Sequence, residues 1–274
     1  MATTFEIVIS AQDADQLYAG QAAHALFAEI DRLEDELSRF RPGSDVFYLS
    51  QLKAGESAHV GLATWDCLCL AKSVYEETDR AFDITIGPLM SLWRTPGGEP
   101  RHPPEDELAY AHKIVGSHLF SLDDDGLEVT VAAAPMIFDL GAVGKGYALD
   151  MCADVLREWS IHNALLNAGD STVLAVGNEK PGCTGWTVTI GPDDQKQTLV
   201  LEDRAVSGSG FAVQGAHIMN PRTLTPVPVK PQRSYAIAPN AAMSDALSTA
   251  FMVMEEKEII ELCARFPGVE HLSL

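Results

Sequence analysis

The segment Asp139-Leu-Gly-Ala-Val-Gly-Lys-Gly-Tyr-Ala-Leu-Asp150 combines residue types that suit anion binding. It places the end of a predicted strand, a glycine-rich turn and the start of a predicted helix in succession. Free backbone N–H groups and the positive end of the helix then meet at one point, which favours an anion. The glycine spacing differs from that of a P-loop, and the metal-binding hydroxyl is missing. A tight strand-to-helix turn without a ligand is the alternative that these residues leave open.

A second candidate is Ser244-Asp-Ala-Leu-Ser-Thr249, which opens another predicted helix. Asp245 and Thr249 are four residues apart and therefore share one helix face. Their oxygen atoms suit a hard cation such as Mg²⁺. The alternative is purely structural, with Ser244 capping the helix and Asp245 interacting favourably with its dipole.

His217 is a third candidate, in Gly215-Ala-His-Ile-Met-Asn-Pro-Arg-Thr223. It lies between glycines and an Asn-Pro turn rather than on a periodic apolar face, where a histidine can serve as a general base. A structural histidine is the alternative. Asn167-Ala-Gly-Asp170 has the composition of a turn in which side chains cap the local backbone. The aromatic residues of segment 81–93 either hold a planar ring or belong to the core.

These candidates must be positioned by helices and short strands. Apolar periodicity and end signals predict helices over residues 15–39, 64–78, 145–159, 244–254 and 257–265. Strands are predicted over residues 4–9, 127–131, 136–140, 164–166, 172–176, 186–190, 198–201 and 234–238. Gly87-Pro88 is expected to break regular structure, and the Pro/Gly-rich stretch 95–104 predicts a loop and a seam between two lobes. Mixed short strands without a regular βαβ period favour an α+β fold.

The composition limits the classes of partner. The chain has 274 residues, with 19 Lys and Arg against 39 Asp and Glu, for a formal net charge of −20. At 46% hydrophobic and 21% charged residues it is a globular protein rather than a disordered, collagen-like or coiled-coil chain. The acidic charge argues against nucleic acid and anionic lipid as partners. Binding an anionic small molecule therefore requires a metal or a focused set of donors.

The compartment is predicted from the cysteines and the N-terminal pattern. The five cysteines lack disulfide or zinc-site spacing, which is typical of free thiols in a reducing compartment. The first residues alternate like a strand and lack a signal-peptide pattern, and no apolar run has the length of a membrane span. We expect a cytoplasmic protein with no transmembrane segment.

Taken in order, these segments resemble the FAD:protein FMN transferases, the ApbE-like flavin transferase family. The resemblance covers nearly the whole chain, through Met1-Ala-Thr-Thr-Phe5, Phe40-Arg-Pro-Gly-Ser-Asp45, Ala81-Phe-Asp-Ile-Thr-Ile-Gly-Pro-Leu89, Asp139 to Asp150, Asn167-Ala-Gly169, Ser209-Gly210, His217-Ile-Met-Asn-Pro-Arg-Thr223 and Ser244 to Thr249. The pair D-L-G-x-x-x-K-G-Y-A-x-D and D-A-L-S-T is its most specific part.

The resemblance implies one domain over residues 1–274, built of mixed, largely antiparallel sheets with helices packed on them and a flavin site between two lobes. It implies that Mg²⁺ is held by the main-chain carbonyl of Ala142 and by the side chains of Asp245 and Thr249. The implied contacts with FAD are Met1, Phe40, Ala81, Phe82, Asp83, Asp139, Lys145 and Met219. His217 matches the family's histidine.

The implied reaction cleaves the FAD pyrophosphate, transfers FMN to a Ser or Thr hydroxyl of an acceptor flavoprotein and releases AMP. Mg²⁺ would neutralise the pyrophosphate, and the glycine-rich turn and Lys145 would hold its other oxygens. His217 is the candidate base for the acceptor hydroxyl. The alternatives are a Mg²⁺-dependent FAD pyrophosphatase that uses water as the acceptor and a non-catalytic FAD-binding protein.

Five positions depart from the family pattern, and one of them is Ser50, where the family often has Asn. Asp170 replaces a glycine and Ser171 an acid in the turn after Asn167, and Gly208 replaces a threonine. Leu224 replaces the glycine of P-R-T-G, in the turn expected to position His217. The implied metal ligands and Lys145 are intact, so we expect activity, and the departures leave the substrate preference open.

Overall fold

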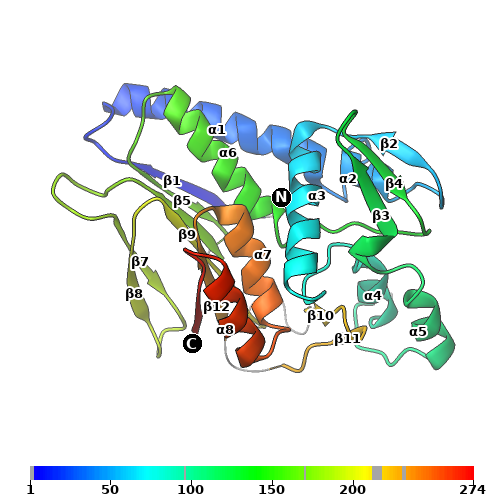
Figure 1. The fold of residues 1–274 in the computed structure, drawn as a ribbon. Coiled ribbons are helices and arrows are strands. Elements are labelled where there is room, and N and C mark those ends of the chain that lie inside the picture. Colours follow the sequence, from blue (N-terminus) through cyan, green and yellow to red (C-terminus); the bar gives the residue numbers. More distant parts are fainter. Residues whose placement is uncertain (1–2, 96, 170, 212–217, 230–232) are drawn as a thin grey trace.

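The computed structural model describes residues 3–95, 97–169, 171–211, 218–229 and 233–274. Its centre is a six-stranded sheet in which each neighbouring pair of strands is antiparallel (Figure 1). Across the sheet the strands run in the order β1 (Phe5–Ile9), β5 (Ala164–Ala168), β6 (Thr172–Val176), β9 (Arg204–Ser209), β12 (Ser234–Ala238) and β13 (Glu270–Ser273). This confirms the α+β prediction of mixed, largely antiparallel sheets.

Three smaller sheets complete the strand content of the described residues. A three-stranded sheet has the order β2 (Ser57–His59), β4 (Glu128–Val131) and β3 (Phe120–Asp123). Two hairpins are formed by β7 (Trp186–Ile190) with β8 (Gln197–Leu201) and by β10 (Met219–Asn220) with β11 (Thr225–Pro226). The helices are α1 (Gln16–Leu37), α2 (Asp45–Leu49), α3 (Leu62–Glu77), α4 (Gly87–Leu92), α5 (Glu105–Ala111), the 3₁₀-helix η1 (Ser117–Leu119), α6 (Gly144–Glu158), α7 (Ala241–Phe251) and α8 (Glu256–Arg265).

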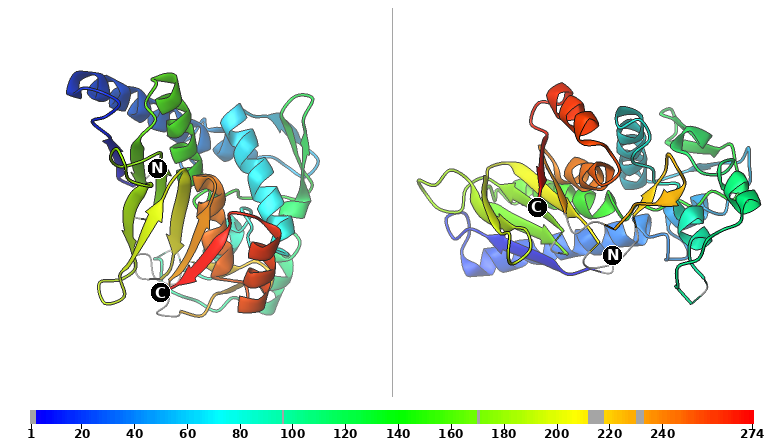
Figure 2. Two further views of the ribbon diagram at one scale, coloured as in Figure 1. Left: turned by 60° about the vertical axis from the view of Figure 1, so that its left-hand side comes forward. Right: turned by 90° about the horizontal axis from the view of Figure 1, so that it is seen from below.

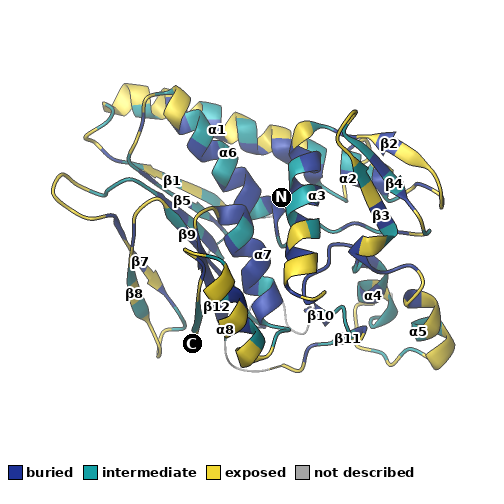
Figure 3. Ribbon diagram, in the orientation of Figure 1, coloured by how far each residue is buried: buried dark blue, intermediate teal, exposed yellow. Residues whose placement is uncertain are grey.

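The two faces of the main sheet are covered by different elements (Figures 1 and 2). Strand β12 illustrates this, because Ala236 and Ala238 join the cluster that includes α7, whereas Tyr235 and Ile237 join the β7–β8 hairpin. Helices α1 and α6 pack on the β1, β5 and β6 side of the sheet. Small side chains thus let α7 approach the sheet closely, and α7 is buried almost throughout (Figure 3).

Helix α7 also packs closely against α6. A Cβ on Gly146 would lie 2.1 Å from the carbonyl oxygen of Ala241, so only glycine permits this approach. One turn further along α6, the Asp150 carboxylate accepts hydrogen bonds from the backbone N–H groups of Ala241 at 2.7 Å and Ala242 at 2.9 Å. Burial raises the pKa of Asp150 to about 6 despite these two bonds. The motif residues Gly146 and Asp150 therefore fix where α7 begins.

Most predicted elements are found within a few residues of their expected ends, but three predictions were wrong. Residues 136–140 form no strand, and Ile137 makes only an isolated bridge to Ile86. Gly87-Pro88 begins α4 instead of breaking regular structure, because proline in a first helical turn gives up an N–H that has no intrahelical partner. Helix α7 begins at Ala241 and is capped by Asn240, whereas the Ser244 hydroxyl donates to Ala236 O at 2.7 Å.

Several elements were not predicted at all, namely α2, α5, η1, β2, β3, β9, β10, β11 and β13. Most of them have five residues or fewer, too few to show a clear period. Residues 97–104 contain no helix or strand, as expected of the loop that joins α4 to α5. None of the helices in the described residues combines the length and the apolar character that crossing a membrane requires.

Candidate active site around Asp245

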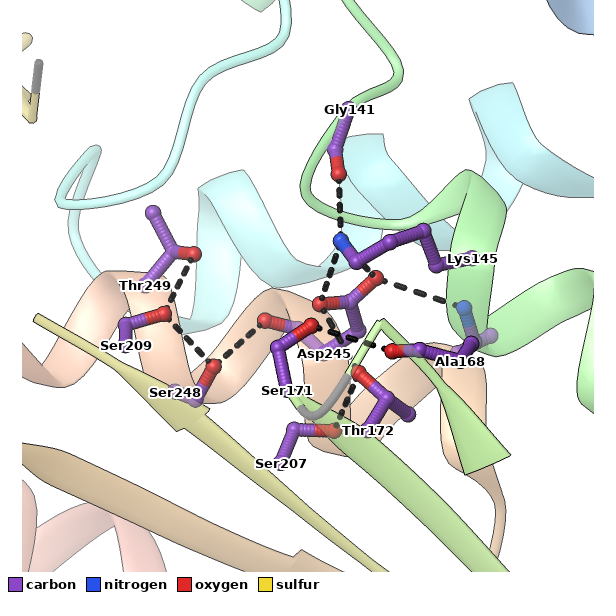
Figure 4. A network of polar contacts seen from close by, with 12 residues as sticks. Gly141, Lys145, Ala168, Ser171, Thr172, Ser207, Ser209, Asp245, Ser248 and Thr249 are labelled. Atoms are coloured by element: carbon purple, nitrogen blue, oxygen red, sulfur yellow. Dashed lines mark hydrogen bonds and ion pairs between the residues drawn. The ribbon is translucent and has the colours of Figure 1, made fainter. Parts of the chain in front are cut away.

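Asp245, in the second turn of α7, is the centre of a polar cluster inside the molecule (Figure 4). The residue is only 4% exposed. Its Oδ2 accepts from the Lys145 ammonium at 3.1 Å and from the Gly146 N–H at 3.3 Å. Its Oδ1 contacts the ammonium at 3.2 Å and accepts from the Thr172 hydroxyl at 3.4 Å. The start of α6, the start of β6 and α7 therefore meet at one carboxylate.

Lys145 connects this carboxylate to the glycine-rich turn. Its ammonium also donates to the carbonyl oxygen of Gly141 at 2.8 Å. Within the turn, Asp139 Oδ1 accepts from the Gly141 N–H at 2.9 Å. The carbonyl that faces the ammonium belongs to Gly141, one residue before Ala142, the position implied by the family resemblance. The structure brings together the two segments that form the specific pair of motifs.

A chain of hydroxyl groups extends from Asp245 toward Thr249. Ser248 donates to the main-chain oxygen of Asp245 at 2.9 Å. The Ser209 hydroxyl lies 2.9 Å from that of Ser248 and 3.1 Å from that of Thr249. Ser207, two residues earlier on β9, donates to Thr172 at 3.2 Å. The two serines share one face of the strand because strand side chains alternate.

Sequence reasoning missed the roles of Thr172, Ser207 and Ser248. A usable signal was present, since serines at positions 207 and 209 have the spacing of residues on the same face of a strand. No strand was predicted over these residues, however, so the spacing could not be interpreted as a shared strand face.

The donor set suits a hard cation. The described residues contain no group of three or more His, Cys, Asp or Glu that could hold a metal ion. Asp245 supplies a buried carboxylate, Thr249 a hydroxyl, and the turn a carbonyl that already faces a positive charge. Oxygen ligands of these kinds are the ones that Mg²⁺ accepts, with water completing its shell. The residues present therefore fit the implied ion.

A second group of predicted residues lies beside the glycine-rich turn. The other Asp139 oxygen is 3.4 Å from Arg39 Nε, and the Arg39 guanidinium lies 4.3 Å from the centre of the Phe40 ring. Phe40 is 76% exposed. An exposed aromatic ring beside the glycine-rich turn can stack on a planar ligand. Arg39 adds a cation that the sequence analysis did not single out.

Residues 81–83 are buried and serve the local fold. Phe82 is 3% exposed within the core, which favours the core alternative for this side chain. The Asp83 carboxylate accepts from the N–H and hydroxyl of Thr85, both at 2.8 Å, and from the hydroxyl and N–H of Ser117 at 2.9 and 3.1 Å. Burial raises the pKa of Asp83. Ala81 is likewise buried.

Met219 is buried on the strand that follows the predicted histidine. It packs in a cluster with Leu89 and Leu224 beside α4 and α5. Arg222, in the same hairpin, donates to the carbonyl oxygens of Thr78 and Asp79 and binds Glu258 on α8 at 2.9 Å. The hairpin is thus held to the ends of two helices.

Two predicted site residues, Met1 and His217, lie outside the described residues, as does Asp170. Their roles stay predictions. Among the described residues, a hollow of about 400 Å³ is lined by Thr3, Thr4, Glu6, Asn167 and Gly169. It lies where β1 begins and β5 ends, close in sequence to Thr172 of the Asp245 cluster.

Comparisons with known proteins give a consistent result. A family model described as the ApbE family matches residues 1–273. The FAD:protein FMN transferase of Vibrio cholerae serotype O1 is 27% identical over 252 residues, which cover 85% of this chain and 74% of the relative. The FAD:protein FMN transferase of Salmonella typhimurium is 25% identical, over 97% of this chain and 79% of the relative.

Solved structures agree with these relatives. The ApbE protein of Thermotoga maritima has a TM-score of 0.82 at 29% identity, covering 99% of this chain and 90% of that one. The flavin transferase ApbE from Vibrio cholerae has a TM-score of 0.83 at 23% identity, covering 100% of this chain and 90% of that one. The second likeness concerns the fold alone.

Proposed function

We propose, from the premise that this chain belongs to the ApbE family, that it transfers FMN from FAD to an acceptor protein. The observation that carries the proposal is the buried Asp245 carboxylate, held by Lys145 against the glycine-rich turn. Two segments about 100 residues apart in the chain form this contact, and both belong to the pair of motifs most specific to the family.

The site has to bind a pyrophosphate inside a protein of net charge −20. Lys145 and Arg39 supply positive charge close to the turn. At the start of α6 the Gly144 N–H already donates to the Leu140 carbonyl oxygen and the Gly146 N–H to Asp245, so the phosphate contacts fall chiefly to the Lys145 and Arg39 side chains. These donors would hold phosphate oxygens, while the exposed Phe40 ring would contact a planar ring of FAD.

Asp245, Thr249 and a main-chain carbonyl of the turn, from Gly141 or Ala142, are the groups that would hold Mg²⁺. When bound there, the ion would neutralise charge on the pyrophosphate and polarise its phosphorus. Ser209 and Ser248 would orient the Thr249 hydroxyl toward that role.

The finer chemistry follows from the family pattern. The oxygen of an acceptor Ser or Thr would form a bond to the FMN phosphorus, and the bond from that phosphorus to AMP would break. The hydroxyl proton would pass to a base, for which His217 is the candidate. His217→Ala should slow transfer by about 10²–10⁴-fold while leaving FAD affinity nearly unchanged. A simultaneous collapse of FAD affinity would assign the histidine to the binding pocket.

The direct test incubates the purified chain with FAD, Mg²⁺ and a peptide that carries an acceptor Ser or Thr. We expect a covalent flavopeptide and AMP in equal amounts. Free FMN with AMP would instead indicate hydrolysis, and unchanged FAD would indicate a binding protein. Asp193→Asn is a matched control for Asp245→Asn, because this carboxylate lies on the surface beside Lys196 and the loss of its charge should leave the rate unchanged.

A further inference from the structure

The Lys145 ammonium is engaged on two sides within the protein. An ammonium group carries three N–H donors. One side of it faces Gly141 O at 2.8 Å, and another faces the two Asp245 oxygens at 3.1 and 3.2 Å. The Asp245 carboxylate is the charged partner in this arrangement.

The Asp245 carboxylate is committed to the same ammonium through both of its oxygens. Its other partners, the Gly146 N–H and the Thr172 hydroxyl, are neutral. Mg²⁺ binds carboxylate oxygens at about 2.1 Å, so an ion on either oxygen would lie within about 5 Å of the ammonium. Two cations at that separation in a largely buried site repel each other strongly.

We infer that Lys145 is the resident counter-cation of Asp245, and that the ammonium and a divalent cation compete for this carboxylate. The inference rests on the proposed function for the presence of a divalent cation. The ammonium already lies between the Gly141 carbonyl and the Asp245 carboxylate, two of the groups that a hard cation would use.

Competition of this kind couples the two ligands of the site. When a divalent cation takes the carboxylate, Lys145 is released together with N–H donors that it previously spent on Asp245. The residue sits in the first turn of α6, beside the glycine-rich turn, so its flexible stem can carry the ammonium to a phosphate bound there. Binding of the cation thus prepares the site for the anionic substrate, and the metal-free protein keeps its buried charge paired.

The first test measures Mg²⁺ binding by isothermal titration calorimetry without FAD. We expect Lys145→Met to bind Mg²⁺ about 10-fold or more tightly than the wild type, because the competing charge is gone. The matched control is Lys257→Met, which removes an exposed lysine paired with Glu261 and should change the affinity less than 2-fold. Equal or weaker Mg²⁺ binding by Lys145→Met would overturn the inference, as would absence of Mg²⁺ binding in both proteins.

The second test measures thermal unfolding. Lys145→Met leaves a buried carboxylate unpaired, so the metal-free variant should unfold at a lower temperature than the wild type, and saturating Mg²⁺ should remove most of this difference. If Lys145→Met does not fold, Lys145→Gln can replace it, because it keeps a neutral donor beside Asp245. We expect the same changes in Mg²⁺ affinity and unfolding temperature for this variant. A metal-free variant as stable as the wild type would contradict a counter-cation role.

These tests distinguish a failure of the proposed competition from a failure of the proposed transferase activity. A wild type that forms the flavopeptide, together with a Lys145→Met protein without increased Mg²⁺ affinity, refutes the competition alone. A wild type that forms no flavopeptide, together with a Lys145→Met protein that binds Mg²⁺ more tightly, refutes the transferase activity alone.

Discussion

Asp245 and Asp83 are both buried aspartates, but the two regions that hold them satisfy the carboxylate differently. Asp245 faces an ammonium, a backbone N–H and a hydroxyl, all from distant segments. Asp83 is held by the N–H and hydroxyl groups of Thr85 and Ser117, all neutral donors. A carboxylate paired with a movable cation can exchange that partner for another cation. One enclosed by short, fixed hydrogen bonds holds a loop in place.

The two parts of the predicted site therefore differ in their chemistry. The Asp245 region contains charged and hydroxyl groups around a glycine-rich turn. Phe82 and Met219, by contrast, are enclosed by apolar packing, and Asp83 by neutral hydrogen-bond donors. Mutations in the first region should change binding and rate, and mutations in the second should change stability.

The largest expected effect is at Asp245. Asp245→Asn keeps the shape of the side chain but removes its charge, so Mg²⁺-stimulated FMN transfer should fall about 10³-fold or more in a folded protein. The measurement is flavopeptide formation per folded protein, with folding checked by circular dichroism.

Asp83→Asn is the matching variant in the other region. Its amide nitrogen would face donors in place of one carboxylate oxygen, so it should destabilise the fold by about 1–3 kcal/mol. Transfer per folded molecule should remain near that of the wild type. Full activity of Asp245→Asn, or loss of activity in folded Asp83→Asn, would show that the two aspartates do not differ in this way.

The next prediction contrasts the exposed Phe40 with the buried Phe82. Phe82→Ala should lower the free energy of unfolding by about 3–5 kcal/mol, because the ring is fully packed. Phe40→Ala should barely change stability but weaken FAD binding by about 1–3 kcal/mol through lost ring contact. Chemical denaturation and an FAD titration measure the two quantities. An unchanged FAD affinity in Phe40→Ala would remove this residue from the site.

A pH effect is expected at Asp150, which fixes the start of α7. Its pKa of about 6 lies above the value of an unfolded aspartate, so the folded state holds the proton more tightly. The resulting stabilisation, about 3 kcal/mol, is fully present below about pH 4 and is lost as the pH rises through about 6. In Asp150→Asn this contribution is absent. The stability difference between wild type and variant should therefore shrink across that window, as measured by denaturation at several pH values.

The smallest effect concerns Leu224, which has φ of +56° and a buried side chain. Leu224→Gly relieves backbone strain but loses apolar packing, for a net destabilisation of about 1–3 kcal/mol. Leu224→Ala keeps the strain and loses nearly the same packing, so it should be about 1 kcal/mol less stable than Leu224→Gly. Equal stability of the two variants would show that the left-handed backbone carries no cost here.

Strands and helices with a regular spacing of apolar residues could be predicted from the sequence alone. Strands β6, β7 and β12 begin and end at the predicted residues, because alternation or a short apolar run between turn residues is a local property. The helices α1, α3 and α6 were also predicted from apolar spacing, with ends that differ by one or two residues. The two specific motifs likewise sufficed for the family, since residue types at fixed spacing are read directly from the chain.

The contacts that those residues make depend on the tertiary structure. Asp245 and Lys145 are 100 positions apart, and their ion pair depends on the close approach of α6 and α7 that Gly146 permits. The same packing starts α7 at Ala241 rather than at Ser244, because Asn240 and Asp150 bind its first N–H groups. No local sequence pattern indicates that Phe40 is exposed whereas Phe82 is buried. Burial and pairing between remote segments arise from how elements pack, which the local pattern of a sequence does not encode.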